Sequence, residues 1–189
     1  MNHNGDDAVR SNSFHERFQR ACKEFVDDVL AEWGFVKKEP QKPSSNFCNT
    51  TYCKGELYVQ FSCTDDVRDH PVMLYVSLGE GSTEDFFEWD WSHIALWHLT
   101  KEKNLGEKGY YLHTDNITIE DAVSHAITDL IECGQDFLSG DLKLFKKVRA
   151  KITREREPYK VHSPFPLDES SRTFIERSIE MREKFSKEE

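Results

Sequence analysis

Residues 56–81 read ELYVQFSCTDDVRDHPVMLYVSLGEG, and this stretch decides the fold. Apolar and polar residues alternate over residues 57–63 and again over residues 72–78, with a polar break at residues 64–70 between them. Successive side chains of a strand point to opposite faces of a sheet, so a period of two predicts two strands, each with one buried face and one wetter face. The short break predicts that the strands pair antiparallel, and Pro71 suits the start of the second strand, where no ladder donor is needed.

A helix is predicted before these strands. Ser13 and Glu16 form a capping box at its expected start. Its apolar residues recur at the spacing of one helical face, at Phe14, Phe18, Cys22, Phe25, Val29 and Trp33. Gly34 suits the left-handed residue that ends a helix, and Phe35 would then fold back onto Leu30. We expect the apolar face of this helix to cover one face of the sheet.

Three further strands are predicted around the central pair. Residues 35–38 are expected to be extended, and residues 46–53 form a strand candidate joined to the next strand by a tight turn at Lys54-Gly55. Residues 110–113 form another short strand candidate. Residues 91–98 fit the period of a helix and that of a strand equally well, so the pattern leaves both open.

Helices are predicted for most of the second half of the chain. Thr118 begins one helix, with Asp121 in the first turn, where a carboxylate suits the helix dipole. A basic helix follows over about residues 143–156, and prolines then keep the chain extended to about residue 167. A last amphipathic helix is expected over residues 169–185.

These elements predict a single α+β domain. A mostly antiparallel sheet of three to five strands would pack against the N-terminal helix and the helix that begins at Thr118, with a C-terminal helical arm attached. We expect residues 1–12 to form a flexible tail and residues 13–157 to form the domain. Residues 158–189 would supply the Pro-rich linker and the arm.

Composition limits the classes of function. The net charge is -10, which argues against a surface that binds nucleic acid over its whole extent and favours a basic partner. Residues 1–13 lack the apolar run of a signal peptide, and no run of apolar residues is long enough to span a membrane. The odd number and scattered spacing of the cysteines predict reduced thiols in a cytoplasm, at Cys22, Cys48, Cys53, Cys63 and Cys133.

The sequence offers two candidate sites, a zinc site and a histidine- or cysteine-based catalytic site. In each case the alternative is that the residues simply pack in or beside the core. Cys48, Cys53, Cys63 and His70 have the ligand types that zinc takes, but alternation places Cys53 on the opposite face from the other two cysteines. We therefore predict no metal site and no cofactor. No nucleophile or phosphate-loop motif occurs, so the chain leans away from an enzyme and no catalytic residue is assigned. The histidines to examine are His93, His98, His113 and His125.

Charged segments give two binding hypotheses. The basic helix could bind phosphates through Lys146, Lys147 and Arg149, but a solvated face, or one docked on the chain's own acidic stretch at residues 80–90, is the simpler interpretation. Residues 84–91 interleave acidic and aromatic side chains, the types that steer and anchor a basic protein partner. The predicted partner-binding residues are Asp85, Glu88, Trp89, Asp90 and Trp91, and the alternative is that the tryptophans fill the core.

Some features resemble the immunity-type proteins, small bacterial α+β domains encoded beside toxins. The resemblance rests on the first helix ending in Trp33-Gly34-Phe35, the strand meander, the pattern Ala126-x3-Leu130 and residues 136–141, DFLSGD. It implies an acidic cytoplasmic protein that binds and blocks a basic protein partner without catalysis, and it carries over no individual site residue. A small enzyme with a histidine or cysteine site at the sheet edge is the alternative, and the oligomeric state stays open.

Overall fold

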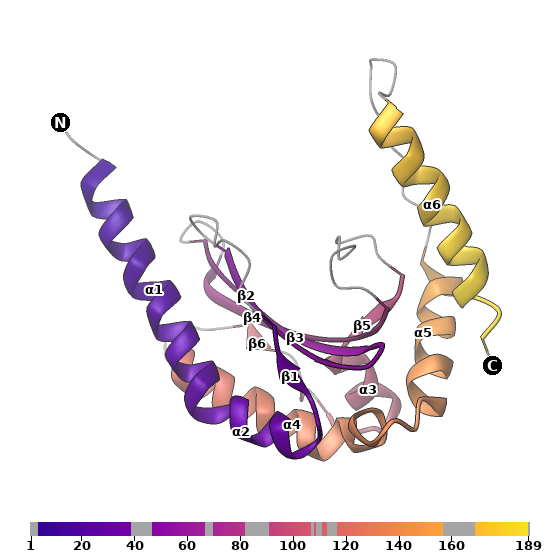
Figure 1. Ribbon diagram of the computed structural model, residues 1–189, viewed down its shortest axis with the longest axis horizontal. Coiled ribbons are helices and arrows are strands. Elements are labelled where there is room, and N and C mark those ends of the chain that lie inside the picture. Colours follow the sequence, from indigo (N-terminus) through magenta and orange to yellow (C-terminus); the bar gives the residue numbers. More distant parts are fainter. Residues whose placement is uncertain are drawn as a thin grey trace.

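The computed structural model describes residues 4–38, 47–66, 70–81, 91–106, 108, 111–112, 117–156 and 169–188, and it has the predicted α+β fold. The sheet is antiparallel, with strand order β1-β2-β3-β4-β5, and β6 also pairs with β4. Figure 1 shows the sheet between α1 on one side and α5 and α6 on the other, with α4 beneath it. No helix among the described residues has both the length and the apolar character needed to cross a bilayer.

The N-terminal helical region is longer than predicted and then ends as predicted. α1 spans Asn4–Phe25 and α2 spans Asp27–Glu32. Residues 4–12 are therefore helical and were wrongly expected to form a tail, so Ser13 lies inside α1 and is not its cap.

Gly34 and Phe35 form the predicted helix end. Gly34 has a φ of 83°, and its N–H donates to the Ala31 carbonyl at 2.9 Å. The Phe35 N–H donates to the Leu30 carbonyl at 3.0 Å, which completes a Schellman motif and turns the chain toward β1. The prediction of this helix end is confirmed.

Each segment that was predicted to form a strand contains one. β1 spans Val36–Lys37, β2 spans Phe47–Lys54, β3 spans Leu57–Asp66 and β4 spans His70–Glu80. β5 spans His93–Ala95 and β6 spans Tyr111–Leu112. The segment that fitted both periods is divided between them, because β5 ends at Ala95 and α3 begins at the next residue and spans Leu96–Glu102.

The predicted turn between β2 and β3 was placed one residue too early. Lys54 pairs with Leu57, so the turn consists of Gly55 and Glu56, and Gly55 has a φ of 58°. The true register differs from the predicted one by two residues, since Cys48 pairs with Cys63. A shift of two residues keeps every side chain on its predicted face, and for this reason the assignment of faces is confirmed.

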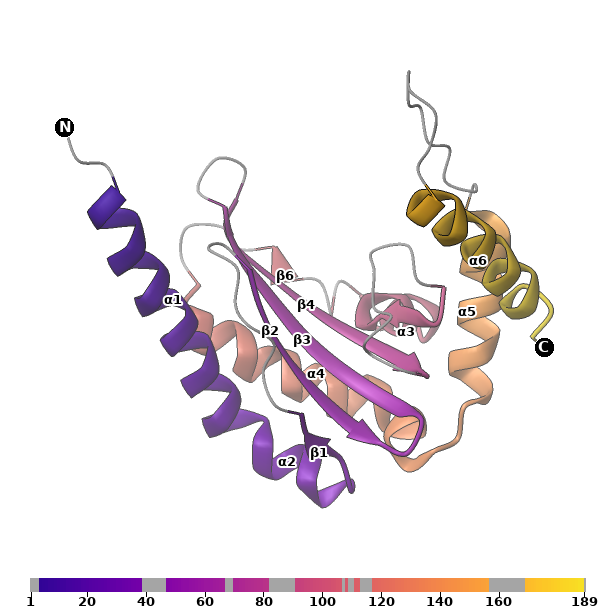
Figure 2. The ribbon, with the colours of Figure 1, turned by 45° about the horizontal axis from the view of Figure 1, so that its top comes forward.

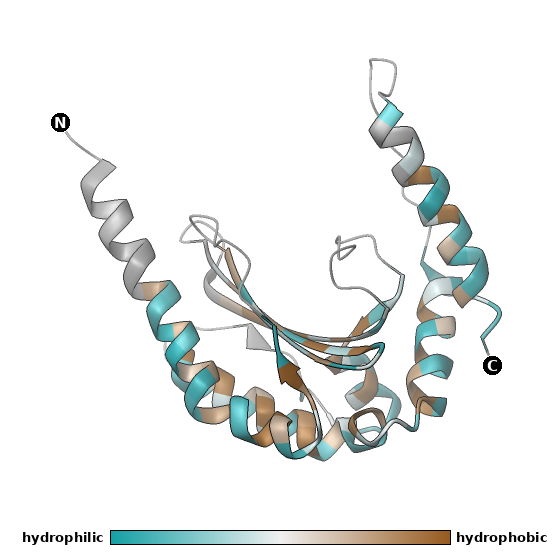
Figure 3. Ribbon diagram, in the orientation of Figure 1, coloured by the Kyte–Doolittle hydropathy of each residue, from teal (hydrophilic) through white to brown (hydrophobic). Residues whose placement is uncertain are grey.

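The remaining helices complete the fold. α4 spans Ile119–Ser139, α5 spans Lys143–Glu155 and α6 spans Glu169–Phe185, in agreement with the predicted segments. Thr118 caps α4 by accepting the Asp121 N–H at 3.1 Å. Along α1 and α4, hydrophilic and hydrophobic residues recur in alternating patches, as expected for helices with one buried face (Figure 3).

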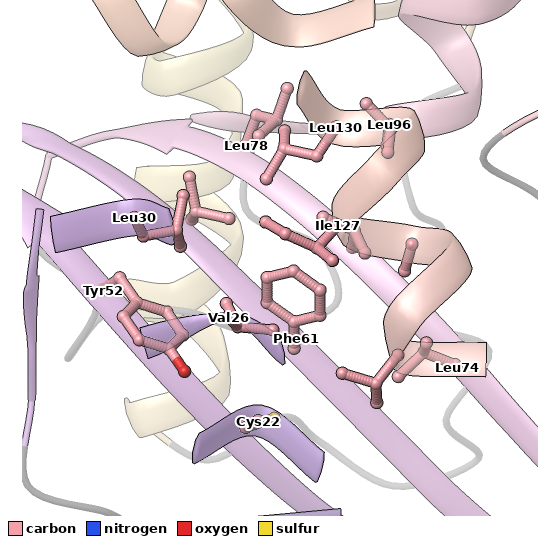
Figure 4. Packing of buried hydrophobic residues seen from close by; sticks show 14 of the residues in the cluster. Cys22, Val26, Leu30, Tyr52, Phe61, Leu74, Leu78, Leu96, Ile127 and Leu130 are labelled. Atoms are coloured by element: carbon pink, nitrogen blue, oxygen red, sulfur yellow. The ribbon is translucent and has the colours of Figure 1, made fainter. Parts of the chain in front are cut away.

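The core lies between one face of the sheet and the helices α1, α2 and α4. Val26 and Leu30 meet Phe61 of β3, and Ile127 and Leu130 of α4 pack beside them over the same face of the sheet (Figure 4). Cys48 and Cys63 lie in this core, whereas Cys53 pairs with Tyr58 on the opposite face. The three thiols therefore cannot meet at one metal ion, and the described residues contain no group of three metal-binding side chains.

The C-terminal helix is docked on the domain through a buried arginine of α5. Arg149 is 1% exposed, and its guanidinium donates to Glu80 at 2.8 Å and to the Ser92 carbonyl at 3.0 Å. The same group donates two hydrogen bonds to Glu188 and lies 4.0 Å from the centroid of the Phe185 ring. The arm thus supplies a carboxylate and an aromatic ring to a buried site whose other groups come from α5 and β4.

Candidate functional site

The face of the sheet that points away from the core bears a cavity of about 1190 Å³. Its floor consists of polar side chains from three adjacent strands. Asn49 of β2 pairs with Ser62 of β3, and Gln60 of β3 pairs with Ser77 of β4, so these side chains share one face. Figure 2 shows these strands lying side by side, with α3 and α5 at the same end of the sheet.

The floor side chains are buried although they are polar. Gln60, Ser62 and Ser77 are 2%, 6% and 7% exposed. The Gln60 Nε2 donates to Thr51 Oγ1 at 3.0 Å, and its Oε1 accepts from the Ser62 hydroxyl at 3.2 Å. Buried polar groups carry a free-energy cost unless they form hydrogen bonds, so a floor of this kind is either internally paired or prepared for a ligand.

Part of the floor is available to a ligand. The side chains of Asn49, Thr64 and Ser77 form no hydrogen bond with another described residue. The two bonds of Gln60 use one of its two N–H donors and one of the two lone pairs of its oxygen. Within the part of the chain that the structure describes, the cavity floor therefore offers several donors and acceptors that form no hydrogen bond, and these groups are uncharged.

Two histidines form one wall, at the edge strand β5 and the start of α3. Burial lowers the pKa of His93 to about 4, and the positive charge of Arg156 adds to this effect. Burial also lowers the pKa of His98 to about 4. Both imidazoles are therefore neutral at pH 7. The wall thus adds no charge to the cavity.

The hydrogen bond of His98 identifies its tautomer. Its Nδ1 accepts the Ala95 N–H at 3.2 Å, so the proton of the neutral ring is on Nε2. In a catalytic triad Nδ1 instead donates to a carboxylate, which holds the ring ready to accept a proton at Nε2. His98 has the opposite arrangement, so the described contacts do not make it a general base of that kind.

Aromatic and charged residues form the ends and rim. Phe47 and Tyr75 are 37% and 39% exposed and line one end of the cavity. Trp97 stacks on His98 at the other end, with 3.6 Å between the ring centroids. The rim contains both signs of charge, from Lys101, Glu102, Lys151, Glu155 and Arg156.

The sequence-predicted binding residues lie elsewhere or outside the described residues. Asp85, Glu88, Trp89 and Asp90 belong to residues 82–90, which the structure does not describe. Trp91 is 6% exposed, and its indole N–H donates to Ser178 of α6 at 2.9 Å. Trp91 therefore packs as an interior side chain that helps to hold the C-terminal helix.

The other singled-out residues can be placed as well. His93 and His98 line the cavity, His125 is exposed on α4, and His113 is outside the described residues. Lys146 pairs with Glu80, and Lys147 pairs with Glu102 at 2.8 Å. These basic residues of α5 thus contact carboxylates of the chain itself. Glu80 belongs to the acidic stretch that was the predicted docking partner, whereas Glu102 lies outside that stretch.

Sequence reasoning missed the cavity floor, although the pattern contained a signal for it. The predicted wetter face of residues 57–63 and 72–78 is polar at Gln60, Ser62 and Ser77. Such residues are typical of any solvent-exposed strand face, so their burial in a cavity was not predictable. Comparison of the chain with protein-family models, with curated proteins and with solved structures finds no match.

Proposed function

We propose that this protein is a non-catalytic binding protein that holds its ligand over the polar face of the sheet. The observation that carries the proposal is the set of uncommitted polar side chains on the cavity floor, Asn49 and Ser77 above all. Each of these groups faces the cavity, and a hydrogen bond from a ligand to such a group contributes about 0.5–1.5 kcal/mol net, because it replaces a bond to water. Ligand sites are typically concave, with a few placed polar groups and aromatic walls, as here.

The lining supports binding more than catalysis. A general base or nucleophile needs a partner that shifts its reactivity, such as a carboxylate on a histidine. The described contacts of His98 are with the Ala95 backbone and the Trp97 ring. The low pKa of both imidazoles makes them weak bases at pH 7.

The nature of the partner extends the proposal. The net charge of -10 favours encounter with a basic molecule, because long-range attraction raises association rates. This charge and the resemblance to immunity-type proteins support a role in which the chain binds and blocks a basic protein partner. The net charge would raise the rate of association, and the uncharged cavity floor would stabilise the bound complex.

A matched pair of double variants tests the proposal. Asn49→Ala/Ser77→Ala removes two floor groups that pair with no other described residue, so folding should be little affected. Thr128→Ala/Gln135→Ala removes the same two chemical types from the exposed side of α4. A panel of neutral peptides, neutral oligosaccharides and nucleosides is screened by thermal unfolding of wild type and both variants.

A ligand at 100 times its Kd stabilises its protein by about 2.7 kcal/mol. We expect at least one class in the panel to stabilise wild type and the α4 variant but not the floor variant. If no compound distinguishes the floor variant from wild type, the cavity is not the binding site and the proposal fails.

A histidine-based enzyme is the second candidate, because His93 and His98 line the same cavity at the edge strand. Mass spectrometry of a ligand after prolonged incubation separates the two. A binding protein returns the ligand unchanged, whereas an enzyme returns a product whose formation is lost in His93→Gln or His98→Gln.

A further inference from the structure

We infer that the ligand of this cavity is an extended segment of another polypeptide, recognised mainly through its main chain. The inference rests on the proposed function and names the chemical class of the ligand. It follows from the spacing of the floor groups, from their lack of charge and from the shape of the cavity, taken in that order.

The spacing of the floor groups matches the repeat of an extended peptide. Gln60, Ser62 and Thr64 are alternate residues of β3 and all line the cavity. Alternate residues of a strand are separated by about 6.8 Å, which is also the distance after which the main-chain groups of an extended peptide repeat. A peptide that runs along β3 would therefore meet a hydrogen-bonding side chain at each repeat.

The floor chemistry matches main-chain amides. Asn49 and Gln60 each present an N–H donor and a carbonyl acceptor, the same pair of groups that a peptide unit presents. Ser77 and Thr64 have hydroxyls, which donate or accept as the ligand requires. The floor itself has no cation, because Lys101, Lys151 and Arg156 belong to the rim, so an anion held on the floor would bury its charge at a free-energy cost.

The ends of the cavity suit side chains of the same segment. Phe47 and Tyr75 are exposed at one end, where they can cover an apolar side chain. Lys101, Glu155 and Arg156 at the other end can pair with a charged side chain of either sign. The cavity volume of about 1190 Å³ exceeds what a small metabolite needs and fits several residues.

The experiment selects a peptide and then asks what it recognises. A phage-displayed library of random dodecapeptides is selected against the full chain, with counter-selection on Asn49→Ala/Ser77→Ala. The enriched peptide is synthesised, and its Kd is measured by calorimetry for wild type, for each single variant and for the control Thr128→Ala/Gln135→Ala. A set of analogues with one backbone N-methyl group each is measured in the same way.

Main-chain recognition predicts a specific result. Asn49→Ala and Ser77→Ala should each raise the Kd about tenfold, since a lost hydrogen bond to a buried partner is worth about 1–2 kcal/mol. N-methylation at alternate residues should weaken binding by a similar factor, while the α4 control should leave the Kd unchanged. Alternation in the N-methyl series is the result that side-chain recognition would not produce.

Other outcomes overturn the inference. One is that no peptide is enriched. Another is that the enriched peptide binds wild type and both floor variants with the same Kd. The third is that N-methylation leaves the Kd unchanged at every position. Maltoheptaose and chitohexaose serve as neutral oligosaccharide probes. If either oligosaccharide binds wild type but not the floor variants, and no peptide binds, the peptide inference fails. The cavity would then still be the binding site. If neither peptides nor oligosaccharides bind, and nucleosides also fail, the proposed function fails with it.

Discussion

Arg149 and Glu188 form a bidentate pair although 39 residues separate them along the chain. The Nε and Nη2 atoms of Arg149 donate to the Glu188 carboxylate at 2.8 and 2.6 Å. Two parallel charge-assisted bonds are stronger and more directional than a single contact. Arg149 also binds Glu80 at 2.8 Å, so one guanidinium joins α5 to the end of β4 and to the residues that follow α6.

Loss of the buried guanidinium should be costly. Arg149→Met preserves most of the side-chain volume but leaves Glu80 and Glu188 without their shared partner. Removal of one member of a buried ion pair typically costs about 3–5 kcal/mol. We expect a loss near the lower end of this range in urea unfolding, because both carboxylates have some access to water.

Lys147→Met is the control for this prediction. Lys147 lies on the same helix, but its side chain is 65% exposed in its pair with Glu102. Exposed pairs are worth about 0–1 kcal/mol, so the variant should unfold within 1 kcal/mol of wild type. Equal effects of the two substitutions would show that Arg149 does not hold the arm.

Gly79 should tolerate no larger residue while Tyr58 is opposite it. Gly79 pairs with Tyr58 in the β3–β4 ladder, and a Cβ at this position would lie 2.1 Å from the Tyr58 ring. Gly79→Ala should therefore destabilise the protein by about 1–3 kcal/mol or more, because overpacking forces the ring or the strand to move. Urea unfolding measures the loss.

A double-mutant cycle tests whether the ring is the cause. Tyr58→Ala alone should be destabilising, since the side chain is buried. In the Tyr58→Ala background, Gly79→Ala should cost little, which would give a coupling energy of about 1 kcal/mol or more. Additive effects of the two substitutions would contradict the proposed clash.

Acid should destabilise the protein through the two cavity histidines. Each has its folded pKa lowered from 6.5 to about 4, so between these values the unfolded chain binds protons that the folded chain does not. Their contribution to stability is complete above pH 6.5 and is lost progressively as the pH falls toward 4. The loss is at most on the order of 3 kcal/mol for each histidine.

Unfolding measured by urea at several pH values checks this prediction. His93→Gln/His98→Gln should unfold with a weaker dependence on pH between 6.5 and 4 than wild type. His125→Gln is the control, because His125 is exposed on α4. The prediction is wrong if the double variant and wild type lose stability in parallel over this interval.

Thiol reactivity should follow burial along the chain. Cys22, Cys48, Cys63 and Cys133 are buried, whereas Cys53 is partly exposed on the other face of the sheet. Burial raises the pKa of Cys22 to about 12, which leaves almost no reactive thiolate at pH 8. With a chromogenic disulfide reagent, we expect one fast thiol in the native protein, and Cys53→Ser should remove the fast phase.

The unfolded protein supplies the reference for this measurement. No disulfide joins the five cysteines, all of which belong to the described residues, so the five thiols should react together in denaturant. If the native Cys53→Ser variant still shows the fast phase, another thiol is accessible and the prediction is wrong.

Local features of the fold could be predicted from the sequence because neighbours along the chain decide them. The helix end at Gly34 depends on a left-handed residue followed by an apolar one, and both lie within two positions of the helix. The faces of β3 and β4 follow from alternation, which needs no knowledge of the partner strand. The start of α4 at Thr118 follows in the same way from a side chain that caps its own helix.

Only the tertiary structure decided where distant parts meet. The Gly55-Glu56 turn depends on the pairing of whole strands, and a local turn signal was one residue off. The environment of Arg149 combines groups from the end of β4, from Ser92 just before β5 and from the C-terminal segment. These groups are distant in the chain, so the sequence around Arg149 looks like an ordinary basic helix. The cavity likewise assembles floor residues from three strands with walls from α3 and α5.

The difference has a physical reason. Secondary structure, and the face of an element on which a side chain lies, depend on backbone geometry and on residues a few positions apart. The local sequence is therefore enough to predict them. The enclosure of Gln60 and Ser77 depends on the walls around them, and the residues of these walls lie on elements far away in the chain. Alternation thus predicted that these side chains share a face, and the packing of α3 and α5 beside that face made it a cavity.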